Sequence, residues 1–110
     1  NLVDGTITGS TFRADGFEIP GLSAPDGAVT LGFRAEDASI ANGTGQLTEK
    51  VYSMELLGDA TMVTVRAAGA QLSVKAAKDY RTEIGNTVSF NITADICHVF
   101  DGTTGERVAG

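Results

Sequence analysis

The chain has 110 residues, 42% of them hydrophobic, and this length and composition fit one domain with its own core. Fourteen acidic residues against eight basic ones give a net charge of -6, and with five phenylalanines, two tyrosines and no tryptophan the chain offers neither a basic phosphate-binding surface nor an aromatic stacking platform, so we expect no nucleic-acid partner. No apolar run approaches the roughly 20 residues that span a bilayer.

Two strands are predicted near the start of the chain. The first covers Leu2 to Thr8. The second covers Thr11 to Ile19, with a bend at Asp15-Gly16, and it stops at Pro20 because proline cannot donate to a strand ladder. Glycine and serine between residues 21 and 27 then predict a loop.

The middle of the chain alternates between apolar and polar residues, which is typical of half-buried strands. Its predicted strands have apolar faces made by Val29, Leu31 and Phe33; by Tyr52, Met54 and Leu56; by Thr61, Val63 and Val65; and by Leu72, Val74 and Ala76. The first of these strands ends near Arg34, and the second ends at Gly58-Asp59. The last two form a hairpin around Ala68-Gly69.

The last strand has the longest alternation, with apolar residues at Val88, Phe90, Ile92, Ala94 and Ile96. If this strand continues to Phe100, then Ile96, His98 and Phe100 lie on the core face and Cys97 and Val99 lie on the other face. The segment from Asp101 to Gly105 predicts a turn whose side chains bond to their own backbone, followed by a short return strand.

These elements predict an all-β fold, an antiparallel OB-like barrel or sandwich. No amphipathic helix of ten residues is apparent, and short helical turns are expected only at residues 35 to 39 and 78 to 84. A loop is expected at residues 42 to 45.

A single cysteine fits a reducing compartment, so we expect a cytoplasmic location. Because the chain starts at Asn1, without methionine or a leader, we expect a fragment or a processed product.

Cys97, His98 and Asp101 are the first candidate for chemistry, as a nucleophile with its base or as half of a metal site. Neighbouring side chains on a strand point to opposite faces, so Cys97 and His98 cannot readily form a thiolate and imidazole pair. A metal site would need at least two more ligands, and no C-x-x-C or H-x-x-H spacing supplies them. The structural interpretation, a strand followed by a turn, is favoured.

The second candidate consists of Arg34, Glu36 and Asp37, where carboxylates beside an arginine could act in acid and base chemistry. No other group converges on them in the sequence, so we expect instead an exposed ion pair that fixes a loop. The glycines never form G-x-x-x-x-G-K-[ST], so the chain lacks a P-loop.

Four segments in register resemble the C-terminal regulatory domain, often called the TOBE domain, of ATP-binding subunits of ABC sugar importers of the maltose and glycerol-3-phosphate type. These segments are NLVDGTITG (1–9), VTLGFRAEDASI (29–40), VYSMELLGDATMVTVRAAGAQL (51–72) and GNTVSFNITADICHVFDGTTGERV (85–108). The resemblance covers nearly the whole chain.

Three short family motifs carry the match, G-x-R-P-E, E-P-L-G and H-L-F-D-x-x-T-G. The matching residues are Gly32, Arg34 and Glu36 in the first motif; Glu55, Leu57 and Gly58 in the second; and His98, Phe100, Asp101, Thr104 and Gly105 in the third. Ala35 and Leu56 stand where proline is usual, and Val99 stands for leucine. Candidate interface or motif residues are Arg34, Glu36, Asp37, Glu55, Gly58, His98, Phe100 and Asp101.

The resemblance implies a non-catalytic regulatory and dimerisation domain with an OB-like barrel. It implies a bacterial subunit whose ATPase domain, with its ATP and Mg, precedes Asn1 in cis, and which works with membrane permease subunits at the cytoplasmic side of the inner membrane. A homodimer through this domain is expected, and Cys97 is expected to be incidental. The alternatives are a module that binds a small molecule or an oxyanion and, less favoured, an enzyme that uses Cys97, His98 and Asp101.

Overall fold

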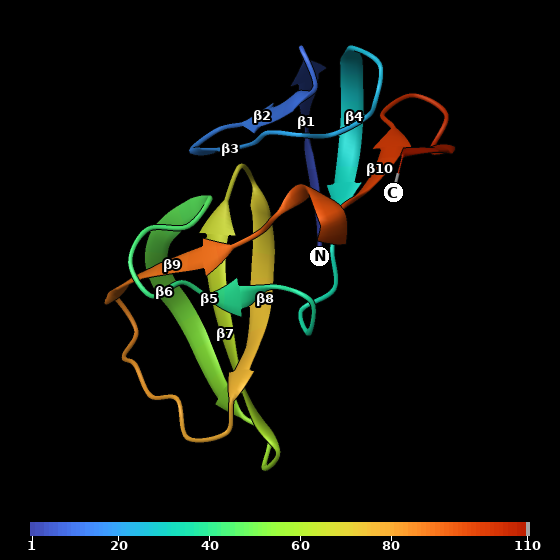
Figure 1. Ribbon diagram of the computed structural model, residues 1–110. Coiled ribbons are helices and arrows are strands. Elements are labelled where there is room, and N and C mark those ends of the chain that lie inside the picture. Colours follow the sequence, from blue (N-terminus) through green and yellow to red (C-terminus); the bar gives the residue numbers. More distant parts are fainter. Residues whose placement is uncertain (110) are drawn as a thin grey trace.

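The computed structural model describes residues 1–109, which form two antiparallel β-sheets and one short 3₁₀-helix (Figure 1). The six-stranded sheet has the order β11-β10-β4-β1-β2-β3. Its strands are β1 (Leu2–Thr8), β2 (Thr11–Ala14), β3 (Phe17–Ile19), β4 (Gly27–Gly32), β10 (His98–Asp101) and β11 (Arg107–Ala109). Both ends of the described chain therefore belong to one sheet.

The five-stranded sheet has the order β5-β9-β6-β7-β8 and curls into a nearly closed barrel. Its strands are β5 (Ser39–Ile40), β6 (Leu47–Leu56), β7 (Ala60–Ala67), β8 (Ala70–Ala77) and β9 (Thr87–Asn91). The edge strands β5 and β8 come into contact, and just before β5 the Lys75 N–H donates to the Ala35 carbonyl at 2.8 Å. The predicted all-β, OB-like class is confirmed.

One contiguous apolar core runs through both sheets. Val3, Leu31 and Val99 are paired neighbours on β1, β4 and β10, and all three are buried. In the barrel, Phe90 on β9 pairs with Leu47 on β6, and both are buried. The described residues therefore contain a complete core of their own.

The predicted strand from Thr11 to Ile19 is wrong in one respect, because it folds back on itself. β2 and β3 pair as a hairpin, with Ala14 opposite Phe17. Gly16 has a φ of 96°, a conformation that needs no Cβ, and this lets the chain reverse where a bend was expected. By contrast, the predicted turn at Ala68-Gly69 is confirmed, since it closes the β7–β8 hairpin with positive φ at both residues.

The predicted continuous strand from Val88 to Phe100 is also wrong. β9 ends at Asn91, a 3₁₀-helix η1 (Ala94–Ile96) follows, and β10 then joins the other sheet. The helix changes the phase of the alternation, so Cys97 and Val99 face the core while His98 and Phe100 are only partly buried. The predicted assignment of the two faces beyond Ile96 is therefore reversed.

The apolar face predicted for β6 does not form as expected. Tyr52 and Leu56 are exposed, and Met54 is partly buried. The register with β7 shifts between Val51 and Ser53, which makes Tyr52 an extra bulge residue that no longer alternates with its neighbours. The guanidinium of Arg66 lies 4.9 Å from the Tyr52 ring centre on the outside of the barrel.

The helical turns expected at residues 35 to 39 and 78 to 84 are not helices in the described chain. The first is a hydrogen-bonded turn that leads into β5, and the second is an irregular loop with turns at its ends. The described helix lies instead at Ala94–Ile96, inside a segment whose alternation predicted a strand.

Candidate functional site

Two of the three sequence motifs meet on neighbouring strands. Gly32 on β4 lies directly opposite His98 on β10, and Thr30 lies opposite Phe100. Gly32 also lies opposite Leu2 on β1. Leu31, which lies between Thr30 and Gly32 on β4, is buried in the core. Its two neighbours and their partners on β1 and β10 therefore lie on the other, solvent-facing side of the six-stranded sheet, which we call the outer face.

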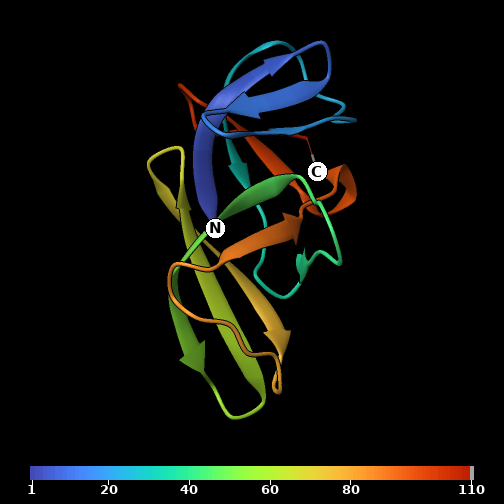
Figure 2. The ribbon, with the colours of Figure 1, turned by 90° about the vertical axis from the view of Figure 1, so that its left-hand side faces the viewer.

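The Glu55 and Gly58 motif lies elsewhere, in the β6–β7 turn at the end of the molecule opposite the six-stranded sheet (Figure 2). Both residues are exposed, and Gly58 has a φ of 88°. The turn closes with the Leu57 N–H donating to the Ala60 carbonyl at 2.9 Å. This motif therefore does not form one site with His98.

Arg34, Glu36 and Asp37 are exposed in the turn that follows β4. The Asp37 N–H donates to the Arg34 carbonyl at 3.0 Å, so the backbone fixes this turn. The expected ion pair does not form: across residues 1–109 the structure has one ion pair, between Arg13 and Glu18. These side chains gather no catalytic constellation.

Cys97, His98 and Asp101 each bond to a different partner. The buried Cys97 Sγ lies 3.4 Å from the Thr93 carbonyl. Burial, reinforced by the Asp95 carboxylate, raises the pKa of Cys97 to about 12, so the thiol stays protonated at neutral pH and is a weak nucleophile.

His98 and Asp101 serve the return of the chain into β11. An Arg107 guanidinium nitrogen lies 2.6 Å from His98 Nδ1 and, because arginine can only donate, Nδ1 accepts this bond. Asp101 Oδ1 accepts the N–H groups of Thr103 and Thr104, both at 2.8 Å. The bond from Thr104 and then that from Thr103 lower the pKa of the Asp101 carboxyl. The predicted turn chemistry at Asp101 is confirmed.

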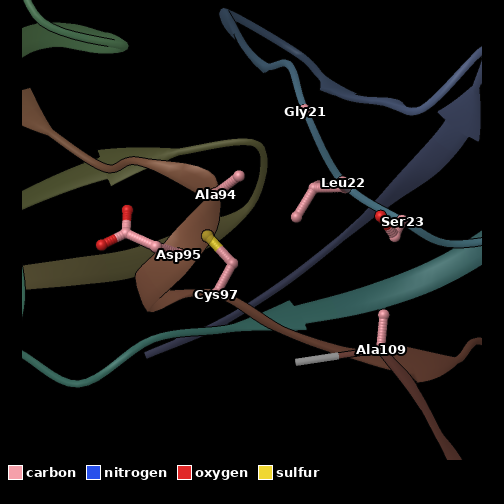
Figure 3. A pocket seen from close by; sticks show the side chains of 7 residues that line it. All are labelled: Gly21, Leu22, Ser23, Ala94, Asp95, Cys97 and Ala109. Atoms are coloured by element: carbon pink, nitrogen blue, oxygen red, sulfur yellow. The ribbon is translucent and has the colours of Figure 1, made fainter.

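A surface pocket of about 600 Å³ lies beside Cys97 (Figure 3). Its lining residues are Gly21, Leu22, Ser23, Ala94, Asp95, Cys97 and Ala109. In Figure 3 the Leu22 side chain points into the space beside Ala94 and Cys97, and the Cys97 sulfur lies against the η1 turn. The Asp95 carboxylate points away from Leu22 and accepts a hydrogen bond from Thr93 Oγ1. No group of three potential metal ligands occurs among residues 1–109. The pocket brings no reactive groups together.

Sequence reasoning missed Leu2 and Arg107, which flank the motif residues on the outer face and on β11. The alternation along β1 could have identified Leu2. It lies on the same face as Asp4 and Thr6, so it is an apolar residue on the exposed, polar face of its strand. No sequence signal paired Arg107 with His98, since their contact depends on how β10 and β11 are aligned.

No helix among the described residues is long and apolar enough to cross a membrane.

The comparison with protein families matches residues 31–100 to the TOBE domain. This range holds the end of β4, all of β5 to β9, η1 and most of β10.

Curated relatives are similar over a longer stretch. The xylose/arabinose import ATP-binding protein of Haloferax volcanii is 34% identical over 121 residues, covering 98% of this chain and 32% of that protein. The sn-glycerol-3-phosphate import ATP-binding protein of Salmonella typhimurium is 34% identical over 119 residues, covering 98% of this chain and 33% of that protein. The chain thus spans about a third of the length of these relatives, and by the family match and these identities it belongs to the TOBE domain family.

Proposed function

We propose that this chain is the regulatory domain of the ATP-binding subunit of a carbohydrate importer. The observation that carries the proposal is the similarity over 98% of the chain to two import ATP-binding proteins that are about three times as long. In this proposal the domain is one part of a longer subunit that energises uptake, and the chemistry belongs to another part.

The residues of the chain support a role without catalysis. ATP and Mg would be held by an ATPase domain that precedes Asn1, because this sequence contains no P-loop of its own. Cys97 is buried and protonated, and Asp101 is engaged by its own turn. The subunit would lie at the cytoplasmic side of the membrane and act with permease subunits.

Dimerisation through this domain is part of the proposal. Exposed apolar side chains on the barrel support it, since such side chains on a soluble surface are candidates for protein contacts. They are Tyr52, Leu56 and Leu57. Sedimentation of the domain over a range of concentrations tests this part, and a monomer at every concentration would remove it while leaving the regulatory assignment.

The coding sequence upstream of Asn1 tests the whole proposal. We expect it to encode a Walker A motif and an ABC signature in the same reading frame. A helix-turn-helix segment, or an initiation codon at this position, would contradict the assignment to an import ATPase.

Oxyanion binding finds little support in the pocket beside Cys97. Its one charged lining residue is Asp95, which would repel an anion. We therefore expect molybdate, tungstate and sulfate to leave the melting temperature of the domain unchanged. A saturable rise in melting temperature with one of them would favour the binding module instead.

A further inference from the structure

The outer face presents apolar side chains to solvent at one end of the six-stranded sheet. Leu2 is 63% exposed, and Phe100 is partly buried. Leu2 pairs with Gly32, and Phe100 pairs with Thr30, the residue two positions before Gly32 on the same strand. The two apolar side chains therefore stand on either side of a glycine.

Gly32 is buried beneath these two side chains. A Cβ placed on Gly32 would lie 3.0 Å from Leu2 Cδ2 and 3.5 Å from a ring carbon of Phe100. Both side chains thus lean over the glycine, and a hollow of about 310 Å³ lies against Leu2, Thr30, Phe100 and Gly105. A hollow of this kind can receive an apolar side chain from another protein surface.

Polar groups surround this apolar centre. Asp4 lies opposite Thr30 on the same face and accepts a hydrogen bond from the Thr30 hydroxyl at 2.8 Å. On the other side the exposed Arg107 lies opposite Phe100. An apolar centre with a charged rim is the usual composition of a contact between two folded surfaces.

The start of the chain lies at this centre. The Asn1 carbonyl accepts the Phe33 N–H at 3.1 Å and would lie 3.4 Å from a Cβ on Gly32. In the subunit proposed above, the polypeptide that precedes Asn1 approaches the domain beside Leu2. The relatives place about two thirds of their length outside the matched region, which is enough for a folded neighbour.

We propose that the outer face around Leu2, Gly32 and Phe100 is the docking surface for the ATPase domain that precedes Asn1 in the same polypeptide, with an apolar side chain of that domain seated in the hollow. This proposal rests on the proposed function, because it takes the preceding domain from it. It explains why Gly32, His98 and Phe100, from two matched motifs, face outward: they serve a contact between domains as well as the sheet.

Hydroxyl-radical footprinting read by mass spectrometry tests the proposal at single side chains. The full-length subunit, shown beforehand to hydrolyse ATP, is compared with the isolated 110-residue domain, which has a complete core of its own. We expect the oxidation rates of Leu2 and Phe100 to fall several-fold in the full-length subunit, because docking removes both side chains from water. The control is Ile84, which is 73% exposed in the β8–β9 loop and should be oxidised equally in both proteins.

A variant separates docking from a general change in the domain. Phe100→Ser in the full-length subunit should return Leu2 to the oxidation rate of the isolated domain, whereas Ile84→Ser should leave Leu2 protected. Equal oxidation of Leu2 and Phe100 in both proteins, in a subunit that hydrolyses ATP, would overturn the docking proposal and leave the proposed function intact. Protection that appears only with rising protein concentration, or only with the permease present, would assign the face to a second copy or to the permease and would also overturn it. Absence of nucleotide-binding motifs upstream of Asn1 is a failure of the proposed function itself.

Discussion

At the scale of single residues, Cys97 is a packing residue with a suppressed thiol. It is 2% exposed, and burial raises its pKa from an ordinary value of 9.0 to about 12. In the unfolded chain the thiol loses its proton near pH 9, while in the folded domain it keeps it. The folded form therefore binds the proton more tightly, and the stability that comes from this residue is complete below pH 9 and is lost as the pH rises toward 12.

The first prediction compares the native chain with Cys97→Ala on either side of pH 9. Below that pH the native chain should be more stable by about 1 kcal/mol, since the variant leaves a small cavity. Above it, the difference should shrink by about 1.4 kcal/mol for each pH unit, because only the native chain has a thiolate to gain on unfolding. Urea unfolding gives both free energies, and a difference that stays constant with pH would show that the thiol is not suppressed.

Asp101 leads to the second prediction. Its carboxylate accepts two backbone N–H groups in the turn before β11, which lowers its pKa. A lowered pKa means that the stabilisation is present above the unfolded value and is lost as the pH falls through the folded one. Asp101→Ala should therefore lower the midpoint of urea unfolding at neutral pH, and the difference should vanish in acid. Asp101→Asn keeps the acceptor oxygen and should lose less at neutral pH, and an equal loss in both variants would contradict the role of these bonds.

At the scale of elements, the barrel depends on a close approach between Gly45 and β9. A Cβ on Gly45 would lie 2.2 Å from the Phe90 carbonyl oxygen, and the Gly45 N–H donates to Ser89 Oγ at 2.7 Å. No side chain fits at this position without moving the backbone of a core strand.

The third prediction is that Gly45→Ala destabilises the domain by about 1–3 kcal/mol through this steric overlap. Chemical denaturation measures the loss. Gly9→Asn is the matched control: Gly9 has a φ of 58° and open space around it, and asparagine tolerates this conformation, so it should cost much less. Equal losses in the two variants would mean that the approach at Gly45 is not the cause.

Asn1 fastens the six-stranded sheet to the edge of the barrel. Its side-chain amide donates to the Ser73 carbonyl and accepts the Ser73 N–H, both at 2.8 Å, and so takes the place of a neighbouring strand for one residue of β8. An edge that is paired in this way is not free to pair with another chain.

The fourth prediction is that Asn1→Ala removes both bonds, at a cost of about 1 kcal/mol each. Hydrogen exchange of the Ser73 amide should become several-fold faster, while the amide of Val74, the next residue of β8 and the partner of Val63 on β7, serves as the internal control. An unchanged Ser73 amide would mean that the strand edge is protected by other contacts.

The sequence predicted strands well where alternation and local turns define them. The β7–β8 hairpin has uninterrupted alternation and a two-residue turn with positive φ, and both features are local. Two errors lie where the phase of the alternation changes: at η1, which reverses the faces of Cys97 and His98, and at the bulge around Tyr52. One extra residue or one 3₁₀ turn exchanges the two faces of a strand without changing the composition that predicts it.

The candidate site was predictable in its residues and not in its arrangement. The motifs named Gly32, His98 and Phe100, but their meeting on one face depends on β10 leaving the barrel and pairing with β4, a contact between distant parts of the chain. The expected ion pair of Arg34 failed because the turn is closed by its backbone and the side chains remain in water, where such pairs gain little.

At the scale of the whole molecule, the chain is a scaffold whose interior is apolar and whose candidate contacts lie on its surface. The exposed apolar groups lie on different elements, with Leu2 on the outer face of the six-stranded sheet and Leu56 and Leu57 at the β6–β7 end of the barrel. Surfaces on two sheets that share one core can hold two partners at a fixed separation, which suits a regulatory domain. The groups that first suggested chemistry are placed for packing and for turns.

The proposal that this domain regulates an ATPase and contributes no catalytic group can be tested on the activity of the subunit. The direct measurement is ATP hydrolysis by three purified proteins: the full-length subunit, the same subunit ending just before Asn1, and the 110-residue chain alone. The account predicts that the shortened subunit, at saturating protein concentration, still hydrolyses ATP and that the 110-residue chain does not. Hydrolysis by the 110-residue chain, or its complete loss in a shortened subunit that remains folded and binds nucleotide, would contradict the account.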